Sequence, residues 1–471
     1  MTSTSPNPRA SNINPQIFRE YDIRGIADRD LTDDVARAVG RAFADRMREK
    51  GKTRIAVGRD VRLSSPRIRT AMVEGLVERG AHVIDVGQVP TPALYFAVLR
   101  LKADAGAMVT GSHNPIEYNG IKLSEGISSL HGEDIQEIRR RAESPSTAGV
   151  SRGSTEEVSL DKEYLDDLAG RIRLERPLKV VVDPGNGAAS IAGPEFLRRI
   201  GCEVDAIFAE PDGRFPNHLP DPTVPELMKS LVDRVRATKA DVGIGFDGDA
   251  DRVGAVDEKG RLLFGDQVLA LYAGDVLASH PGAPIVFEVK CSQGLVEWVR
   301  EKGGEPIMWK AGHSLIKAKM RELNAPLGGE MSGHMFFADE FPGYDDALYA
   351  AGRLLRILAA SGRPLSALVD ALPQSKYVAT PEIRLDCPDD KKFAIVDQVR
   401  EHFRAGHEVI DVDGARVQFD GGWGLIRASN TQPVLVVRFE ATSKERLAEI
   451  AQEVYDVLAR HPEVTVPALP V

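Results

Sequence analysis

Short apolar runs separated by polar loops and helical patterns follow one another in the same order at three places in the chain. Each place shows an apolar run, an amphipathic stretch, a glycine and a second apolar run. The three sets are residues 54–60, 72–79, Gly80 and 81–86; 178–185, 194–200, Gly201 and 203–208; and 284–290, 293–301, Gly303 and 305–309. Strands that alternate with helices are typical of parallel βαβ units, in which the glycine caps the helix in a left-handed conformation. The pattern predicts three tandem α/β domains of similar topology, with mixed sheets.

The pattern changes after about Ala371. Residues 415–419, 424–428 and 434–439 read as short strands, and Asp-Gly turns at 413–414 and 420–422 precede the first two. Ser443 is expected to cap a closing helix that runs to about Arg460. We therefore predict a C-terminal α+β domain with antiparallel strands. The expected domains are 1–154, 155–259, 260–372 and 373–471, with linkers near 144–154, 257–260 and 372–375.

Composition and charge exclude several classes of protein. The chain has 471 residues, too many for one core, with 42% hydrophobic and 28% charged residues, as in an ordinary globular protein. A net charge of −10 argues against a nucleic-acid partner. Three scattered cysteines without a CxxC pair fit a reducing compartment, and no apolar segment reaches the length of a membrane span. The N-terminal run at 1–8 is polar and lacks the apolar core of a signal peptide. These features predict a cytoplasmic protein without a membrane partner.

Three alternating carboxylates, Asp247, Asp249 and Asp251, follow the apolar run at 241–246. In an extended loop alternate residues point the same way, so all three can converge on one hard cation such as Mg²⁺. A polar surface loop is the simpler alternative. An EF-hand does not fit, because Arg252 occupies its glycine position and the flanks read as strands.

Residues 110–115 place a serine hydroxyl, Ser112, at the tip of a glycine turn beside His113. Taken alone, Ser112 is better explained by a bond to its own turn backbone. A hydrolase nucleophile elbow does not fit, because Asn114 and Pro115 follow the serine. Together with a magnesium-type site, the serine suggests phosphoryl transfer.

Five motifs, at 21–25, 110–115, 247–252, 329–334 and 427–431, resemble those of the α-D-phosphohexomutase superfamily. Within it, the chain is similar to the bacterial phosphomannomutase/phosphoglucomutase group. The motifs run from near the N-terminus to the last domain, so the resemblance covers essentially the whole chain. The sequence departs from the family at Ala250, where glycine is usual.

The resemblance implies that Ser112 carries a phosphate and that Mg²⁺ is held by Asp247, Asp249, Asp251 and an oxygen of that phosphoserine. It places three basic residues, Arg24, Lys122 and Arg252, near the reacting phosphate. Lys122 is a candidate general acid/base if neighbouring cations lower its pKa. His113 is expected to support the loop.

The resemblance also implies a set of substrate contacts. Glu330 and Ser332 are expected to bind the 3- and 4-hydroxyls of the sugar. A second group is expected to grip the non-reacting phosphate: Arg427, Ser429, Asn430 and Thr431. The remaining substrate-binding candidates are Tyr21, Lys290, His313 and His334. Arg438 is either a further contact or a strand residue in an ion pair.

The implied activity is the interconversion of hexose 1- and 6-phosphates in a central cleft, through a hexose 1,6-bisphosphate such as glucose 1,6-bisphosphate. Sugar phosphates are the expected partners of a monomer or weak homo-oligomer. Phosphoglucosamine mutase is the nearest alternative, although Met331 favours the glucose/mannose group. A serine-dependent metal phosphatase shares the serine and the aspartates. A non-catalytic binder is disfavoured by the intact aspartate triad.

Overall fold

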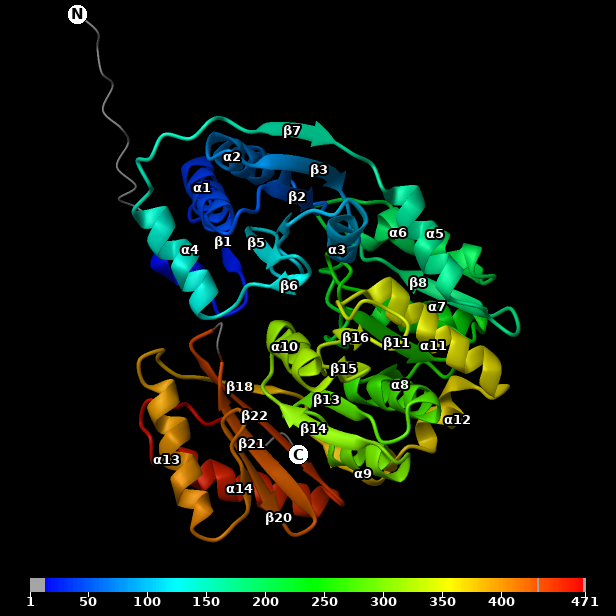
Figure 1. Ribbon diagram of the computed structural model, residues 1–471. Coiled ribbons are helices and arrows are strands. Elements are labelled where there is room, and N and C mark those ends of the chain that lie inside the picture. The colour runs from blue at the N-terminus through cyan, green and yellow to red at the C-terminus, as the bar shows by residue number, and fades with distance from the viewer. Residues whose placement is uncertain (1–12, 430–431, 469–471) are drawn as a thin grey trace, which may run out of the picture.

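The computed structural model describes residues 13–429 and 432–468, which form four units, each built on its own sheet. Figure 1 shows the units placed around a common centre, from the blue first unit to the orange and red fourth. The first three are α/β units with mixed sheets, and the fourth has an antiparallel sheet, as the sequence predicts.

The first unit contains a sheet in the order β1-β5-β4-β2-β3-β7, with β6 beside β5. Its strands are β1 (Ile23–Ile26), β2 (Arg54–Arg59), β3 (His82–Gln88), β4 (Ala105–Val109), β5 (Tyr118–Glu125), β6 (Ser128–Ser129) and β7 (Ser154–Glu157). Its helices are α1 (Asp33–Glu49), α2 (Ser65–Glu78), α3 (Thr91–Arg100) and α4 (Glu133–Glu143), after a 3₁₀ turn at Pro15–Ile17. Ile55 and Val57 pack with α1, α2 and α4, whereas Ala56 packs on the α3 side. Side chains alternate across a strand, so the sheet is covered on both faces.

The second unit follows with a sheet in the order β12-β11-β10-β8-β9. Its elements are α5 (Asp161–Arg171), β8 (Lys179–Asp183), α6 (Ala189–Arg199), β9 (Glu203–Ala206), α7 (Lys229–Thr238), β10 (Val242–Phe246), β11 (Val253–Asp257) and β12 (Leu262–Leu263).

The third unit contains a sheet in the order β14-β13-β15-β16. Its elements are α8 (Gly265–Ser279), β13 (Pro284–Glu288), α9 (Gln293–Glu301), β14 (Glu305–Trp309), α10 (His313–Leu323), β15 (Leu327–Gly329), β16 (Met335–Phe337), α11 (Ala347–Ser361) and α12 (Leu365–Asp370).

The three α/β units repeat one strand order. The sheets share the arrangements β5-β4-β2-β3, β11-β10-β8-β9 and β16-β15-β13-β14. In each, the first strand pairs antiparallel with the second, and the remaining pairs are parallel. Gly80, Gly201 and Gly303, which follow the crossover helices, all have positive φ, as the predicted helix caps require. The predicted repeat is therefore confirmed at the level of topology.

The fourth unit begins after a 3₁₀ turn at Pro373–Lys376 and carries both of its helices on one face of the sheet. Its elements are β17 (Val378–Ala379), β18 (Ile383–Asp386), α13 (Lys392–Arg404), β19 (Val409–Ile410), β20 (Ala415–Phe419), β21 (Gly422–Ala428), β22 (Val434–Ala441) and α14 (Lys444–Leu458). Ser443 caps α14 by accepting the backbone N–H of Arg446, as expected. Trp423 and Leu425 point to the other face, where they pack on Val289 of the third unit.

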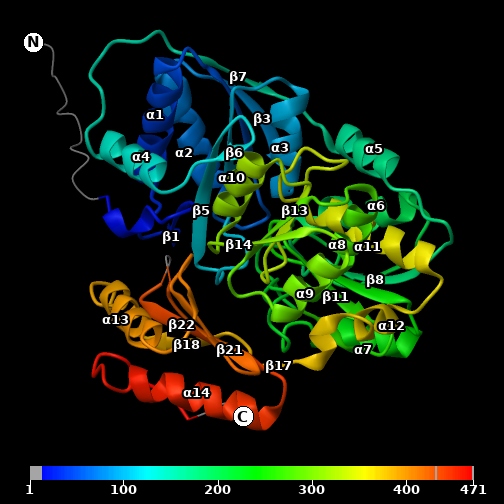
Figure 2. The ribbon, with the colours of Figure 1, turned by 60° about the horizontal axis from the view of Figure 1, so that its bottom comes forward.

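In each unit, one antiparallel hairpin lies at one of the five motifs that resemble those of the family. In the first three units it joins the antiparallel pair, at residues 110–117, 247–252 and 330–334. In the fourth it joins β21 to β22. Figures 1 and 2 show the four units grouped around a common centre, and the loops at 110–117 and 247–252 are in contact there.

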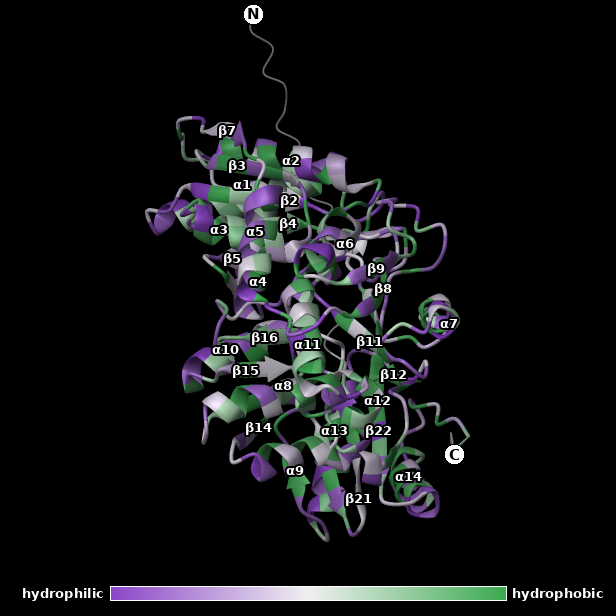
Figure 3. Ribbon diagram, turned by 90° about the vertical axis from the view of Figure 1, so that its right-hand side faces the viewer, coloured by the Kyte–Doolittle hydropathy of each residue, from purple (hydrophilic) through white to green (hydrophobic). Residues whose placement is uncertain are grey.

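A continuous apolar core joins α3 of the first unit to the second and third units. Figure 3 shows the hydrophobic residues along the sheets and the inner faces of the helices. The fourth unit has a separate core. In the part of the chain that is described, no helix is both long and apolar enough to cross a membrane.

Two predicted helix starts were wrong. Helix α2 begins at Ser65 instead of near Met72, because its first turn is polar and lacks the apolar spacing that marks a helix. Helix α6 begins at Ala189, so Pro194 lies inside the helix instead of starting it. In addition, β7 extends the first sheet beyond 154 and β12 extends the second beyond 259. The domain boundaries themselves stay predictions.

Candidate active site

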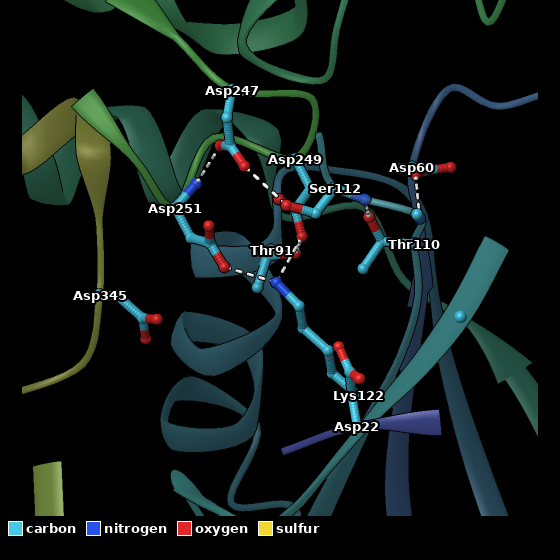
Figure 4. Close-up of polar contacts among 12 residues, drawn as sticks. Asp22, Asp60, Thr91, Thr110, Ser112, Lys122, Asp247, Asp249, Asp251 and Asp345 are labelled. Atoms are coloured by element: carbon cyan, nitrogen blue, oxygen red, sulfur yellow. Dashed lines mark hydrogen bonds and ion pairs between the residues drawn. The ribbon is translucent and has the colours of Figure 1, made fainter. Parts of the chain in front are cut away.

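Ser112 and Asp247 bring the first and second units into direct contact. The Ser112 hydroxyl donates to Asp247 Oδ2 at 2.7 Å and lies 3.0 Å from Nδ1 of His113. Figure 4 shows the serine facing the aspartate loop. Gly248 is required for this approach, because a Cβ there would lie 2.2 Å from the carbonyl oxygen of Ser112. The structure therefore places together the two motifs that suggested phosphoryl transfer.

The Ser112 loop is buried, and its backbone is held by the side chains of Arg62 and Asp60. The sequence did not indicate either contact. Ser112 is 3% exposed and adopts a left-handed φ of 47°. The Arg62 guanidinium donates to the carbonyl oxygen of Ser112 at 2.8 Å and also to those of Asn114, Pro115 and Tyr118. Asp60 accepts the backbone N–H of Gly111 at 3.0 Å. Arg62 therefore fixes the loop through its backbone carbonyl oxygens. Because every residue has such an oxygen, the sequence of the loop gives no signal for these bonds.

The aspartate loop is a tight hairpin turn, so the expected extended loop is wrong. Asp247 Oδ1 accepts the backbone N–H groups of Asp251 and Arg252, both at 3.1 Å. Ala250 has a φ of 64°, a left-handed conformation that glycine adopts more readily. The three carboxylates converge because the turn curls around Asp247, and their oxygens lie within 4.8 Å of one another.

The carboxylate triad fits a hard divalent cation. All three side chains are buried, and among the described residues Asp249 Oδ1 and Asp251 Oδ1 have no hydrogen-bond partner. Burial, with Asp249 and Asp251 close by, raises the pKa of Asp247 well above its ordinary value. Three buried carboxylates need positive charge between them, and an all-oxygen donor set suits Mg²⁺. A site suited to a metal ion is therefore present.

Lys122 extends from β5 into this cluster, where Nζ lies 2.7 Å from Asp249 Oδ2 and 2.5 Å from Asp251 Oδ2 (Figure 4). Burial alone would lower the pKa of Lys122, but the surrounding carboxylates raise it well above its ordinary value. The reason given for an acid/base role, cations that lower this pKa, is wrong in this structure. What the geometry shows is a positive charge placed among the carboxylates.

Arg24 of the first unit and Arg252 of the second both act on the loop that carries the serine. Arg24, on β1, pairs with Asp22 at 2.5 Å and donates to Asn114 Oδ1 of the serine loop at 3.3 Å. Burial, with Arg252 and Arg24 nearby, lowers the pKa of His113 well below its ordinary value, so the ring is neutral. A neutral imidazole that contacts Ser112 fits the supporting role expected for His113.

Asp251, His334 and Asp345 form a second buried cluster in which ligand atoms come close enough to hold an ion. Arg252 Nε donates to Nε2 of His334 at 3.0 Å. A guanidinium only donates, so in a neutral ring the proton lies on Nδ1. That nitrogen lies 3.3 Å from Asp345 Oδ2 and 3.6 Å from Asp251 Oδ1. These contacts place His334 between Asp251 of the metal loop and Asp345 of the third unit.

The sugar-recognition candidates lie around the start of α10. Glu330 Oε1 accepts the backbone N–H of Gly312 at 2.6 Å, and Ser332 is partly buried in the same hairpin. Tyr21, from the first unit, donates to the carbonyl oxygen of Ala311 at 2.6 Å, and its ring lies 6.0 Å from that of His313. A Cβ at Gly312 would lie 2.4 Å from the Tyr21 ring, so only glycine fits. The structure thus brings Tyr21, His313 and Glu330, from two units, to one place.

The predicted phosphate grip lies on the β21–β22 hairpin of the fourth unit. Arg427 is 7% exposed, and its Nε donates to Asp413 Oδ2, which also accepts the backbone N–H of Ala311, both at 3.0 Å. Ser429 is buried on the same hairpin. Asn430 and Thr431 lie outside the described residues. Asp413, which the sequence did not single out, therefore connects the grip to the third unit.

Lys290 and Arg438 lie where the third and fourth units meet. Lys290 pairs with Glu382 at 2.9 Å and Glu288 at 3.3 Å. Arg438 is buried, donates to the carbonyl oxygen of Lys290 and lies 3.9 Å from Asp266. Of the two interpretations of Arg438, the structure favours the ion-paired strand residue.

Three repeated α/β units and an antiparallel fourth unit, with a serine held against a carboxylate triad at their centre, define the phosphohexomutase class of enzyme. The four domains of the phosphoglucomutase/phosphomannomutase family match the chain in order: the alpha/beta/alpha domains I, II and III at residues 15–148, 162–260 and 264–375, and the C-terminal domain at 382–457. The chain belongs to the phosphoglucomutase/phosphomannomutase family.

Individual relatives agree with this assignment. The chain is 45% identical to a phosphomannomutase/phosphoglucomutase of Pseudomonas aeruginosa, over 94% of this chain and 95% of the relative. It is 42% identical to a phosphoglucomutase of Neisseria meningitidis, over 97% of this chain and all of the relative. A solved structure of a family protein from Burkholderia thailandensis superposes with a TM-score of 0.91 at 44% identity, covering 97% of this chain and 100% of that one.

Proposed function

We propose that the protein is a phosphomannomutase/phosphoglucomutase that reversibly interconverts hexose 1-phosphates and hexose 6-phosphates. The observation that carries the proposal is the contact of the Ser112 hydroxyl with Asp247 inside the carboxylate triad. The family assignment and the basic grip in a separate unit support it, because a mutase must bind one phosphate while it transfers the other.

The proposed reaction consists of two phosphoryl transfers in opposite directions. The free hydroxyl of the hexose phosphate attacks the phosphorus on Ser112, the Ser112 Oγ–P bond breaks, and the proton lost by the sugar hydroxyl is replaced on Ser112 Oγ, which is left as a free hydroxyl. The product is a hexose 1,6-bisphosphate, which reorients and returns its other phosphate to Ser112. A bound Mg²⁺ would supply Lewis-acid stabilisation of the phosphoryl group, held by Asp247, Asp249, Asp251 and phosphoserine.

The protein's own residues divide the remaining work. We assign Arg24, Lys122 and Arg252 to neutralising the transferring phosphate. Arg24 contacts the serine loop, Lys122 contacts the triad, and the charge of Arg252 interacts with Asp247 and Asp251. Glu330 and Ser332 are assigned to the sugar hydroxyls, and Tyr21, Lys290, His313 and His334 complete the substrate contacts. Arg427, Ser429, Asn430 and Thr431 are assigned to the distant phosphate, where a guanidinium fork suits a dianion.

We place the reaction in the cytoplasm, with free sugar phosphates as partners and glucose 1,6-bisphosphate as activator. All three cysteines, Cys202, Cys291 and Cys387, are buried and free, which fits a reducing compartment. We also propose that it acts as a monomer or a weak homo-oligomer.

Intact-mass measurement tests the proposal. Incubation with glucose 1,6-bisphosphate is expected to leave one phosphate on the protein, and isotope-labelled glucose 1-phosphate is expected to exchange it. Release of inorganic phosphate without sugar isomerisation would indicate a phosphatase. A mass that never changes would indicate a binder.

Sugar choice follows from which hydroxyls the site contacts. Glucose and mannose differ only at C2, whereas Glu330 and Ser332 are assigned to the 3- and 4-hydroxyls that both share. We expect kcat/KM values within about tenfold for glucose and mannose 1-phosphates. We expect a value roughly 100-fold lower for galactose 1-phosphate, because its inverted 4-hydroxyl leaves a buried partner unpaired. Glucosamine phosphate is expected to be weak. A side-by-side assay of the four sugars decides, and a preference for glucosamine phosphate would reassign the enzyme to phosphoglucosamine mutases.

A further inference from the structure

Lys317, on α10 of the third unit, is buried at 2% exposure and shares its ammonium between two units. Nζ donates to Asp345 Oδ1 at 2.8 Å, to Ser129 Oγ at 2.9 Å and to the Tyr95 hydroxyl at 3.4 Å. An ammonium has three N–H donors, so these three oxygens use all of them. Ser129 and Tyr95 belong to the first unit, which makes Lys317 a buried junction between the two.

The two first-unit residues of this junction also contact each other. The Tyr95 hydroxyl lies 3.0 Å from Ser129 Oγ, and the Lys317 ammonium lies 4.8 Å from the centre of the Tyr95 ring. Both ribbon views place α10 beside β6 (Figures 1 and 2). The ammonium is therefore held by hydrogen bonds and by the face of an aromatic ring.

The elements that Lys317 holds in the first unit also carry the reaction centre. Helix α3, which contains Tyr95, begins at Thr91, whose hydroxyl donates to Asp249 Oδ2 at 2.6 Å. Strand β6, which contains Ser129, pairs with β5, the strand of Lys122. A shift of α3 or β6 would therefore move groups that touch the carboxylate triad.

The third-unit side leads to the sugar-recognition loop. Asp345 Oδ2 lies 3.3 Å from Nδ1 of His334 and 3.4 Å from Nδ1 of His313. Figure 4 shows Asp345 on the Asp251 side of the cluster, apart from Ser112. Asp345 is 1% exposed, so its charge depends on the partner that Lys317 provides.

We propose that Lys317 is a positioning residue, which fixes the sugar-recognition loop of the third unit relative to Ser112 and the carboxylates. It does so by holding Asp345, Ser129 and Tyr95 in one hydrogen-bonded group. The inference rests on the proposed function, since the separation of these loops matters to a reaction that uses both. A displacement of about 1 Å at a reacting centre can lower a rate roughly 100-fold.

Lys317→Met tests the inference, because methionine fills similar space without the ammonium. We expect kcat to fall roughly 10- to 100-fold while KM changes less than about threefold, because no assigned substrate contact is removed. Hydrogen exchange in α3 and β6 is expected to accelerate. Lys319→Met is the matched control: Lys319 lies on the same helix and pairs with the exposed Glu322 at 2.5 Å. We expect its kcat within about twofold of wild type.

A second variant decides the matter if Lys317→Met does not fold. Tyr95→Phe combined with Ser129→Ala removes both first-unit acceptors and leaves the Lys317–Asp345 pair intact. We expect kcat to fall roughly five- to tenfold with little change in KM. The inference would be overturned if the folded variants kept the wild-type kcat. A lower melting temperature at unchanged kcat would also overturn it, because Lys317 would then have a purely structural role. If the wild type had no mutase activity, the proposed function would be wrong instead. Hydrogen exchange in α3 and β6 would still test whether Lys317 holds these elements in place.

Discussion

Replacing Ser112 with alanine is expected to lower kcat by roughly 10⁴-fold or more, because the variant has no hydroxyl to carry the phosphate between two transfers. The loop should keep its shape. Arg62 holds it through carbonyl oxygens, and Asp60 through the backbone N–H of Gly111, so neither depends on the serine side chain. Measured melting temperature and circular dichroism should therefore match the wild type while the coupled mutase assay shows almost no turnover.

Ser124→Ala provides the control for the Ser112 variant. Ser124 is a buried serine on β5 of the same unit, and its hydroxyl donates to the Gly106 carbonyl oxygen at 3.5 Å, away from the triad. Its kcat should stay within about twofold of the wild type. The Ser112 variant should also fail to take up phosphate from glucose 1,6-bisphosphate in intact-mass spectra. Near-normal turnover of Ser112→Ala would rule out a phosphoserine mechanism.

The second large effect is expected at Asp249. Asp249→Asn removes one ionic ligand, and it also weakens the bonds from Lys122 and Thr91, which both end on Asp249 Oδ2. Loss of several kcal/mol of charge stabilisation corresponds to a fall in kcat of roughly 100-fold or more. Mg²⁺ titration calorimetry should show weaker binding in the variant than in the wild type.

Asp205→Asn serves as the matched control for Asp249→Asn. Asp205 lies on β9 of the same sheet and pairs with Arg234 at 2.7 Å, with 49% of the Arg234 side chain and 32% of the Asp205 side chain exposed. Exposed pairs contribute little, so activity and Mg²⁺ binding should be unchanged. Chelator treatment should inactivate the wild type, and added Mg²⁺ should restore it. Full activity after exhaustive chelation would mean that the aspartates are no catalytic metal site.

The fold was largely predictable because its signals are local. Apolar runs, helix patterns and the capping glycines Gly80, Gly201 and Gly303 placed three βαβ units, and the strand order confirmed their likeness. The errors have local causes as well. The polar first turn of α2 gives no apolar spacing, and Pro194 reads as a helix start although it lies inside α6.

The site was predictable only where a motif carries it. The three aspartates were named from their spacing and Ser112 from the accompanying motifs and the family resemblance, and the structure places Ser112 in contact with Asp247 of that triad. Arg62, Asp345 and Lys317 were missed, because they act on backbone carbonyls or on partners far along the chain. No spacing rule reports such contacts. The left-handed turn at Ala250 was indicated only by the family resemblance, in which glycine is usual there, since alanine itself carries no signal for a positive φ.

The repeated hairpin has an evolutionary consequence. The carrier serine, the carboxylate triad and the sugar loop occupy the same hairpin of three units with one strand order. Duplication of an ancestral unit would supply three such loops before any of them had a task. Each copy could then change its loop residues while the strands beneath kept the scaffold intact. One loop position of a shared scaffold thus carries three different sets of residues, to which we assign phosphate transfer, metal binding and sugar recognition.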